Sequence, residues 1–288
     1  MRKKKIYIAM VTPFTENHAI DDEAVIRLCQ HYVSMKTDGI VVCGTTGEVS
    51  SLTMEERAHL LNLVQKTVAN HAEIWMGCGT NNTETTLKYC YQAEEMGADG
   101  VMLITPYYVR PSQKGLFEHY SQIASRISLP IMLYNVPKRT GIDLKAKTVI
   151  ELAHRYPNIK ALKQAHFDAE AIEEIMSETS LEVLCGDDGW FDEALNLGMD
   201  GIVSVAGNLT IEPLRKMAEI HALGIHSEKL IQKWKDLSRM CFLVSSPSDI
   251  KTMLNIKGYC SDEVRLPLVK LNEEERQCIS EFMKRQNL

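Results

Sequence analysis

The sequence predicts an α/β protein: a closed (β/α)8 TIM barrel with a C-terminal helical appendage. A short apolar run that ends in Gly, Pro, Thr or Asn recurs along the chain, and a longer segment with helical spacing follows each run. The chain has 288 residues, and a barrel takes about 250. The strands are expected at Ile6–Val11, Gly39–Cys43, Ile74–Cys78, Gly100–Ile104, Pro130–Tyr134, Ile159–Lys163, Leu181–Cys185 and Gly201–Val205.

These runs are apolar on both faces, which is typical of parallel strands covered by helices. So many strand–helix units favour a closed barrel over an open doubly wound sheet. An open sheet more often has fewer strands and a glycine fingerprint for phosphate after the first. Here the first run leads into Thr12-Pro13-Phe14, which carries no such fingerprint.

Helix-start and helix-stop signals separate the runs. Thr53-Met54-Glu55-Glu56 is a cap followed by acidic residues. Asn82-Thr83-Glu84 and Asp143-Leu144 are weaker examples of the same signal. Gly97 and Gly198 precede the next strands as helix-stop glycines.

After Val205 the strand signals stop, and helical patterns continue to the end of the chain. The breaks between these helices are Gly224, Ser245–Pro247 and Gly258. We therefore expect a catalytic barrel in residues 1–223 and a C-terminal helical domain in residues 224–288.

Composition excludes several classes of protein. The net charge of −6 gives no electrostatic reason to expect nucleic acid as a partner. No uncharged apolar stretch approaches the roughly 18–20 residues that span a bilayer, so we expect no membrane partner. The basic start Arg2–Lys5 precedes only a short apolar run that ends at Thr12-Pro13. This pattern favours a solvated N-terminus over a signal peptide.

The cysteines and histidines do not indicate a disulfide framework or a metal site. The eight cysteines form no CxxC pair, and several lie inside apolar runs. In a chain of this length they indicate buried thiols in a reducing, cytoplasmic compartment. The nine histidines form no HxH or HxxxH pair, so we expect no metal.

The residue that most needs an explanation is Lys163, which ends the otherwise apolar run Ile159–Lys163. Because strand side chains alternate, Lys163 shares a face with Ala161, while Lys160 faces the other way. If that face is the barrel interior, Lys163 is buried above a small residue. Burial that lowers its pKa to about 7.5 leaves roughly a quarter of the amines neutral at pH 7, and a neutral amine is a nucleophile. The alternative is a strand-end lysine that reaches solvent.

The active site of a barrel lies at the C-terminal ends of its strands. The loops there supply the hydroxyls of Thr45, Tyr108 and Tyr134. Convergent hydroxyls can move protons without a charged base. Each tyrosine has an alternative role as a packing residue. Tyr107 and Tyr108 are adjacent, so only one of them should face the site.

Two further segments offer anion binding. The turn Gly44–Gly47 presents backbone N–H groups and hydroxyls that suit a carboxylate. It lacks the lysine of a phosphate-binding P-loop, so we do not expect a nucleotide there. Arg139 follows a proline-stiffened turn and could bind a second carboxylate through two hydrogen bonds. The alternative is an ordinary surface arginine.

The acidic residues after the seventh strand have two interpretations. Asp187, Asp188 and Asp192 could be metal ligands, but residues that cap the start of the seventh helix are the more frequent case. We therefore expect them at a helix start.

Four motifs together resemble the dihydrodipicolinate synthase and N-acetylneuraminate lyase family of pyruvate-dependent aldolases, and the resemblance runs along nearly the whole chain. The motifs are GTTGE at Gly44–Glu48, TPYYVRPSQKGL at Thr105–Leu116, YNVPKRTG at Tyr134–Gly141 and ALKQA at Ala161–Ala165. They fall in the family's order and approximate spacing, and jointly they are highly specific.

The resemblance implies a role for each candidate residue. Lys163 would form a covalent imine with pyruvate, without a cofactor. Tyr134 would donate and accept the proton. Thr45, together with Tyr108 from a neighbouring subunit, would complete the relay. The substrate-binding residues would be Thr46 and the Val203 backbone for pyruvate, Arg139 for the carboxylate of the aldehyde, and Gly186 beside them. The family also implies a homotetramer, usually a dimer of dimers.

Within the family, GTTGE and Arg139 resemble the synthase branch rather than the sialic-acid lyase branch. The implied reaction condenses pyruvate with aspartate semialdehyde, on the route to diaminopimelate and lysine. Gln164, His166 and the segment Ser245–Asp249 depart from the usual synthase pattern. The first two bear on the choice of aldehyde and not on the imine chemistry.

Three other departures concern regulation. Val49, Met54 and Thr85 differ from the residues that bind feedback lysine in sensitive synthases. The resemblance therefore implies weak inhibition by lysine, or none.

Alternative functions remain open at this stage. The chain could be another pyruvate-dependent aldolase or dehydratase that acts on a sugar acid, as N-acetylneuraminate lyase does. It could also be a non-catalytic barrel that serves in binding, or a metal-dependent barrel aldolase. The sugar-acid aldolase or dehydratase would form the same adduct with pyruvate. The non-catalytic barrel would form no adduct.

Overall fold

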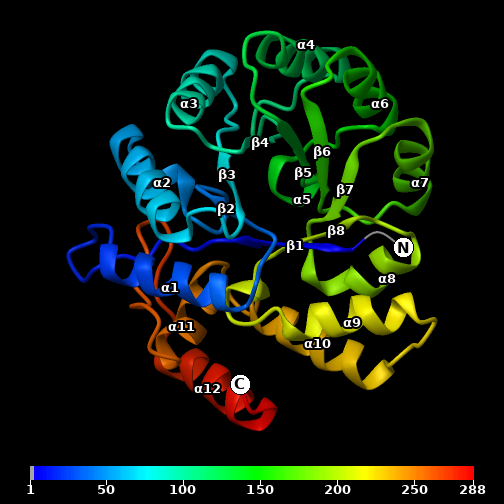
Figure 1. Cartoon of the computed structure of the whole chain (residues 1–288). Coiled ribbons are helices and arrows are strands. Elements are labelled where there is room, and N and C mark those ends of the chain that lie inside the picture. Colours follow the sequence, from blue (N-terminus) through cyan, green and yellow to red (C-terminus); the bar gives the residue numbers. More distant parts are fainter. Residues whose placement is uncertain (1–2) are drawn as a thin grey trace. The chain divides into compact units, whose positions relative to one another are not determined.

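The computed structural model, which describes residues 3–288, contains the expected closed barrel of parallel strands in the order β1 to β8 (Figure 1). Every strand begins and ends within two residues of its expected limits. The strands are β1 (Lys5–Ala9), β2 (Gly39–Val42), β3 (Glu73–Gly77), β4 (Gly100–Ile104), β5 (Ile131–Asn135), β6 (Ile159–Gln164), β7 (Glu182–Cys185) and β8 (Gly201–Ser204). The predicted fold class is confirmed.

The chain divides into two compact units. Unit 1 comprises Ile74–Val203 together with the N-terminal residues up to Lys5. Unit 2 comprises Ile6–Glu73 and Ser204–Leu288. The expected division into residues 1–223 and 224–288 stays a prediction.

Unit 1 contains a run of parallel strands from β3 to β8, each paired with the next. Its helices are α3 (Thr83–Glu95), α4 (Gln113–Ala124), the short α5 (Pro137–Thr140), α6 (Ala146–Arg155), α7 (Ala169–Glu178) and α8 (Phe191–Asn196). Figure 1 shows α3, α4, α6 and α7 outside the strands that they connect. Most strand residues of this unit are buried, because helices cover one face and the barrel interior the other.

Most of the helix starts and stops predicted for unit 1 are found, with a side-chain cap at the start or a left-handed glycine at the end. The Asn82 side chain accepts a hydrogen bond from Thr85 N and caps α3. Gly97 and Gly198 adopt left-handed φ angles of 72° and 86° after α3 and α8. The start expected at Asp143 is wrong, because α6 begins at Ala146. Both oxygens of the Asp143 carboxylate instead have other partners, since Oδ1 accepts a hydrogen bond from Asn135 Nδ2 and Oδ2 pairs with Lys145 Nζ, each at 2.8 Å.

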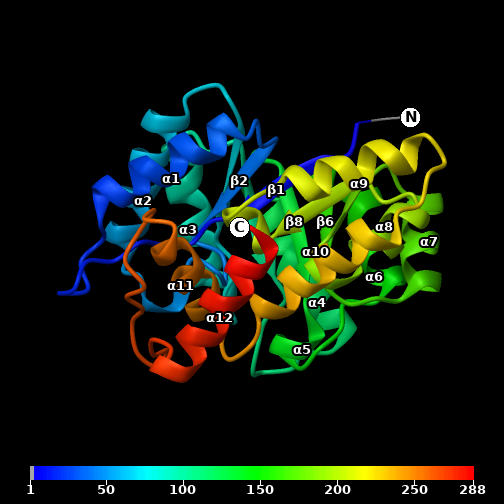
Figure 2. The ribbon, with the colours of Figure 1, turned by 90° about the horizontal axis from the view of Figure 1, so that it is seen from below.

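Unit 2 joins the first two strands to the C-terminal helices. Strands β1 and β2 pair in parallel, with Tyr7 opposite Gly39. The helices are α1 (Asp22–Ser34), the 3-10 helix η1 (Val49–Ser51), α2 (Met54–Val68), the 3-10 helix η3 (Ala206–Asn208), α9 (Glu212–Ala222), α10 (Glu228–Met240), α11 (Ser248–Ile256) and α12 (Glu273–Gln286). Helix α9 packs on α10, and α11 packs on α12 (Figure 2).

The local signals predicted for unit 2 are confirmed. Thr53 and Glu56 form a reciprocal capping box at the start of α2. Gly224 and Gly258, at two of the expected breaks, have left-handed φ angles of 71° and 78°. Pro247, at the third expected break, directly precedes α11 and forms no side-chain capping bond.

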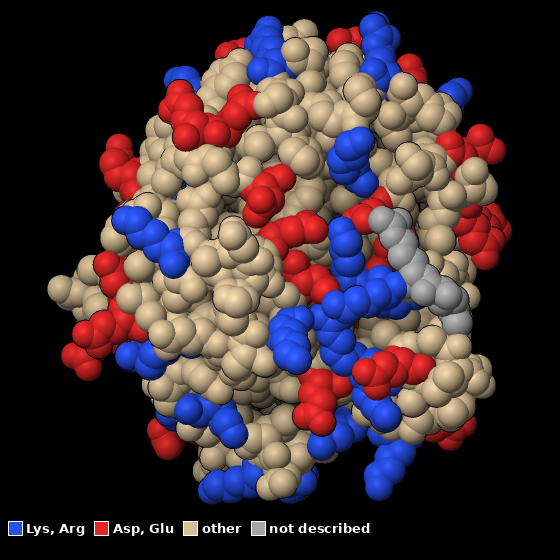
Figure 3. Space-filling model, viewed as in Figure 1, with Lys and Arg blue, Asp and Glu red and all other residues tan. Residues whose placement is uncertain are grey.

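The surface carries charges of both signs. On the face shown in Figure 3, acidic and basic side chains lie next to one another. Across residues 3–288, no helix has the length and the apolar character that crossing a membrane would require. Seven of the cysteines are buried free thiols, and Cys278 is exposed.

Candidate active site

Lys163 lies inside unit 1, near the C-terminal end of β6. Its side chain is only 5% exposed, whereas Lys160 on the same strand is exposed. The alternation predicted from the sequence is therefore confirmed, and the solvent-reaching alternative for Lys163 is wrong. The strand register places Lys163 opposite Tyr134 of β5, and Lys163 Nζ lies 4.2 Å from the centroid of the Tyr134 ring.

The surroundings of Lys163 favour the neutral amine. Burial lowers the pKa of Lys163 to about 8, and the positive charge of Arg139 acts in the same direction. The negative charges of Asp188 and Asp187 oppose this shift. At a pKa of about 8, roughly one amine in ten is neutral at pH 7, compared with about one in 2,500 at the reference pKa. A larger share of neutral amine is what a nucleophilic role requires.

The end of β7 leaves room for the lysine stem. A Cβ atom on Gly186 would lie 2.8 Å from Ala165 Cβ and 3.0 Å from Lys163 Cγ. Both distances are too short for ordinary packing, so a larger residue at position 186 would displace the lysine. Gly186 lies against Lys163, and its predicted contact with substrate stays a prediction.

The acidic residues after β7 mark helix starts, as expected. Asp187 caps the 3-10 helix η2 (Asp188–Trp190) and accepts a hydrogen bond from Gly189 N at 2.9 Å. Asp192 lies in the first turn of α8. Within residues 3–288, no group of three or more His, Cys, Asp or Glu side chains is arranged to hold a metal ion.

A buried amide network beside Lys163 was not predicted from the sequence. Asn135 Nδ2 donates to Gln164 Oε1 at 3.1 Å and to Asp143 Oδ1 at 2.8 Å. Asn135 Oδ1 accepts from Leu144 N at 3.0 Å, and Gln164 Nε2 donates to the His166 carbonyl at 2.9 Å. The network joins the ends of β5 and β6 to the loops that follow them. Asn and Gln at adjacent strand ends were the only signal, and their pairing depends on the register.

Arg139 and Val203 are the two remaining predicted substrate-binding residues of unit 1. Arg139 lies in the last turn of α5 with its side chain exposed, near enough to Lys163 for its charge to act on the amine. Thr140 Oγ1 donates to the Ile142 carbonyl at 2.9 Å and stiffens the turn that carries Arg139. Val203 is buried in β8.

Tyr108 differs from the other candidates because it is 88% exposed, with a left-handed φ of 71°. Tyr107 beside it is 36% exposed. A large aromatic side chain held this far into solvent is unusual for a residue that works within its own chain. The role of Tyr108 in a relay stays a prediction.

Thr45 and Thr46 belong to unit 2, on the turn that follows β2. Gly47 N and Glu48 N donate to the carbonyls of Gly44 and Thr45, each at 3.1 Å. Thr46 is buried and Thr45 is half-buried. The convergence of both threonines with Lys163 stays a prediction.

Comparisons with known proteins agree with this geometry. The model of the dihydrodipicolinate synthetase family matches residues 2–286. The chain is 39% identical over 276 residues to 4-hydroxy-tetrahydrodipicolinate synthase of Bacillus subtilis, covering 94% of this chain and 95% of the relative.

Solved structures give the same result. A dihydrodipicolinate synthase of Bacillus anthracis superposes with a TM-score of 0.95 at 37% identity, covering 99% of this chain and 98% of the other. A monomeric dihydrodipicolinate synthase variant superposes with a TM-score of 0.94 at 32% identity, covering 99% and 97%. The predicted resemblance is confirmed, and the chain belongs to the dihydrodipicolinate synthetase family.

Proposed function

We propose that the chain condenses pyruvate with L-aspartate semialdehyde to 4-hydroxy-tetrahydrodipicolinate, on the route to diaminopimelate and lysine, through an imine on Lys163. The observation that carries the proposal is the buried Lys163 amine, whose pKa is lowered to about 8 beside the Tyr134 ring. The names of the relatives support the choice of substrates.

The chemistry starts at the neutral Lys163 amine. Its nitrogen attacks the keto carbon of pyruvate, a C–N bond forms, and the carbonyl oxygen leaves as water after two proton transfers. The resulting iminium withdraws electrons from the neighbouring methyl group, so that loss of one proton gives an enamine. The enamine carbon bonds to the aldehyde carbon of the second substrate. The amino group of that substrate then displaces Lys163 and closes the ring.

The proposed relay moves the protons of these steps. Tyr134 donates and accepts at the imine nitrogen and the departing oxygen, because its ring already lies against Lys163 Nζ. Thr45 connects Tyr134 to Tyr108 of a second copy of this chain. The exposure of Tyr108 supports that arrangement, since a second copy could cover it.

Substrate binding is divided between two groups of residues. Thr46, the Val203 backbone and Gly186 hold pyruvate, whose carboxylate suits the N–H groups and hydroxyls of the turn after β2. Arg139 binds the carboxylate of the aldehyde in a bidentate manner, and its exposed side chain is placed to meet an incoming substrate.

The imine performs the activation that a metal ion supplies in other aldolases, so the proposal includes no cofactor. We further propose a homotetramer, a dimer of dimers, in the cytoplasm. The buried free thiols support a reducing compartment. Analytical ultracentrifugation with and without pyruvate measures the assembly directly, and a chelator should leave the activity unchanged.

Reduction with borohydride in the presence of pyruvate, followed by peptide mapping, tests the proposal. We expect a stable adduct on Lys163 and consumption of aspartate semialdehyde in a panel of aldehydes. If the adduct formed, but the protein cleaved a sugar acid and did not consume aspartate semialdehyde, a lyase activity would be favoured. Gln164 is the residue that resembles the lyase branch of the family. If no adduct formed, the imine mechanism would be wrong, and a non-catalytic barrel or a metal-dependent aldolase would remain; loss of activity with a chelator would then identify the aldolase.

A further inference from the structure

We propose that Glu48 and Lys251 are positioning residues for the reaction, and that their buried ion pair fixes the turn carrying Thr45 and Thr46. The inference rests on the proposed function of those two threonines. It gives the C-terminal helices of unit 2 a part in catalysis, although they carry none of the predicted site residues.

The turn is held in a conformation that its residues do not favour. Cys43 and Glu48, which lie on either side of Gly44–Gly47, have φ angles of 54° and 53°. Left-handed backbone costs roughly 1–2 kcal/mol for a residue with a side chain. Such a conformation persists only where the surroundings determine it. The contacts that hold this turn are therefore part of the site.

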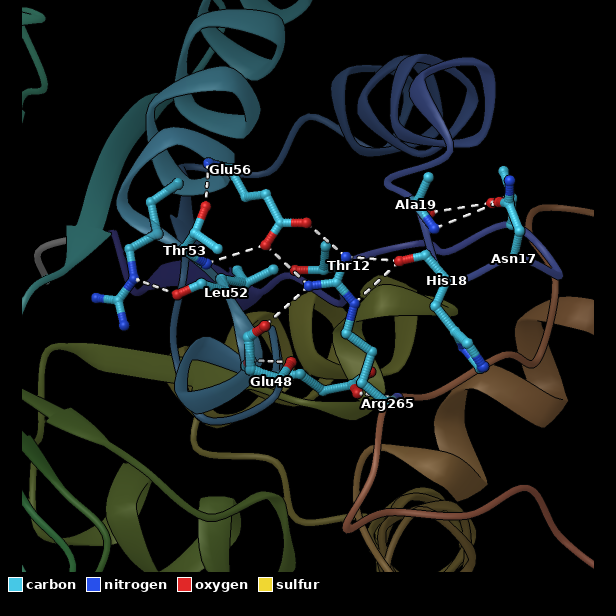
Figure 4. A network of polar contacts seen from close by, with 12 residues as sticks. Thr12, Asn17, His18, Ala19, Glu48, Leu52, Thr53, Glu56 and Arg265 are labelled. Carbon is cyan, nitrogen blue, oxygen red and sulfur yellow. Dashed lines mark hydrogen bonds and ion pairs between the residues drawn. The ribbon is translucent and has the colours of Figure 1, made fainter.

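Glu48 supplies most of these contacts. Its side chain is 2% exposed, and Oε1 accepts a hydrogen bond from Lys251 Nζ. Oε2 accepts from Arg265 N at 2.9 Å. On the other side of the turn, Thr12 Oγ1 donates to the Gly47 carbonyl at 2.7 Å. Figure 4 shows Glu48 and Arg265 within this network.

Lys251 is held as firmly as its partner. Its side chain on α11 is fully buried and lies 4.3 Å from the centroid of the Phe14 ring. Lys251 Nζ also donates to the Glu263 carbonyl at 2.7 Å. Burial lowers the pKa of Lys251, and the Glu48 carboxylate opposes that shift. With one carboxylate, one carbonyl and one ring around it, the amine has no space for a substrate and serves to hold its neighbours.

Arg265 also connects the C-terminal segment 251–265, which carries Lys251, to residues that follow the turn. The Arg265 guanidinium pairs with Glu56 and donates to the carbonyls of Ser51 and His18 (Figure 4). Its Cζ lies 4.3 Å from the centroid of the Phe14 ring. Segment 251–265 therefore holds both ends of the stretch from Glu48 to Glu56, through Lys251 at Glu48 and through Arg265 at Glu56.

Three variants test the proposal: Glu48→Gln, Lys251→Met and the double variant. Lys251→Met leaves the Glu48 carboxylate buried without its cation, so the turn relaxes. We expect kcat/KM for pyruvate to fall about tenfold to 100-fold, because a displacement near 1 Å costs up to about 10² in rate. Glu48→Gln keeps the size and one acceptor of the side chain, and we expect a smaller loss, near threefold to tenfold.

The double variant distinguishes positioning from stability. Removing both charges should restore most of the thermal stability lost in Lys251→Met, because no charge is then left unpaired. A positioning role predicts that kcat/KM stays low even so. Recovery of kcat/KM together with stability would overturn the proposal.

Asp262→Asn is the matched control. It breaks the part-buried Asp262–Arg276 pair in the same C-terminal segment, at 2.6 Å, without touching the turn. We expect a similar small loss of stability and unchanged kcat and KM. Circular dichroism at the assay temperature establishes folding, and Glu48→Gln decides the question if Lys251→Met does not fold.

The wild-type protein separates this test from the test of the proposed function. If borohydride traps no pyruvate on wild-type Lys163, the proposed function fails. If it traps pyruvate normally, but Glu48→Gln and folded Lys251→Met match wild type within twofold in kcat/KM, the positioning role alone fails.

Discussion

Among residues 3–288, two lysines are almost completely buried, and they have opposite surroundings. Lys163 in unit 1 lies over the ring of Tyr134, and its stem packs so closely against Gly186 that a Cβ atom there would collide with it. Lys251 in unit 2 is paired with Glu48 and bonded to a backbone carbonyl. Burial is the largest influence on the pKa of both amines, and it lowers both.

The comparison shows that burial alone does not make a lysine a nucleophile. At Lys251 a carboxylate in direct contact occupies the amine and opposes the lowering of its pKa. At Lys163 the carboxylates of Asp188 and Asp187 act by charge, and Arg139 opposes them. A reactive amine needs burial, the absence of a tight counter-ion and space for a carbonyl carbon, and the difference between these lysines can be measured.

The largest effect is expected from Lys163→Arg. A guanidinium is always protonated and cannot form the imine. We expect kcat to fall by at least about 10⁴, as for the loss of other covalent nucleophiles. Lys251→Met, in contrast, should still give the borohydride adduct on Lys163. An arginine variant that retained a tenth of the activity would contradict the assignment of the nucleophile.

Tyr134→Phe should have the next largest effect. The variant keeps the ring beneath Lys163 and removes only the hydroxyl that moves protons. We expect kcat to fall about 10²- to 10³-fold, within the range of general acid–base catalysis, with a smaller change in the KM for pyruvate. Steady-state kinetics measure both constants. Unchanged kcat would remove Tyr134 from the relay.

Replacing each of the two lysines should also change the free energy of unfolding in opposite directions. Lowering the pKa of Lys163 from 10.5 to about 8 corresponds to a cost of about 3 kcal/mol for burying its ammonium. The full cost is present below pH 8, where folded and unfolded states are both protonated. It disappears between about pH 8 and pH 10.5, because the unfolded state there binds more protons and the free energy of unfolding rises with pH.

Lys163→Met should therefore stabilise the protein at pH 7, by up to about 3 kcal/mol. This gain should shrink as the pH approaches 10.5. Lys251→Met should destabilise it by about 3–5 kcal/mol, because the Glu48 carboxylate remains buried without a partner. Urea unfolding at several pH values measures both. Equal losses in the two variants would show that the pairing of Lys251 does not distinguish it from Lys163.

The smallest effect is expected for feedback inhibition. None of Val49, Met54 and Thr85 carries an acidic group that would pair with the amino groups of free lysine, so millimolar lysine should change the rate little. Initial rates at increasing lysine concentration test this. An inhibition constant in the low-millimolar range or tighter would contradict the prediction.

Much of the fold could be predicted because its signals are local. The strands, the capping box at Thr53 and the glycine stops at Gly97 and Gly198 depend on short-range periodicity and backbone preference. Alternation along one strand placed Lys163 on the face opposite Lys160, but it left open whether that face was the barrel interior. The residues of the neighbouring strand ends were needed to favour the interior.

The rest depends on contacts between residues that are distant in the sequence. Asn135 and Gln164 are 29 residues apart, and Glu48 and Lys251 are 203 apart. No periodicity links such partners. The helix start at Asp143 failed for a different reason: Asn135 lies only eight residues earlier, but its side chain binds the Asp143 carboxylate, an interaction that a helix-start pattern does not reveal.

The pH dependence of pyruvate capture, followed residue by residue, tests the central claim most directly. Peptide mapping after a short borohydride pulse gives the rate of adduct formation on each lysine. We predict a single modified residue, Lys163, with a rate that rises with pH and levels off above a pKa of about 8. Modification of Lys251, or a Lys163 rate that keeps rising to pH 10, would contradict the account.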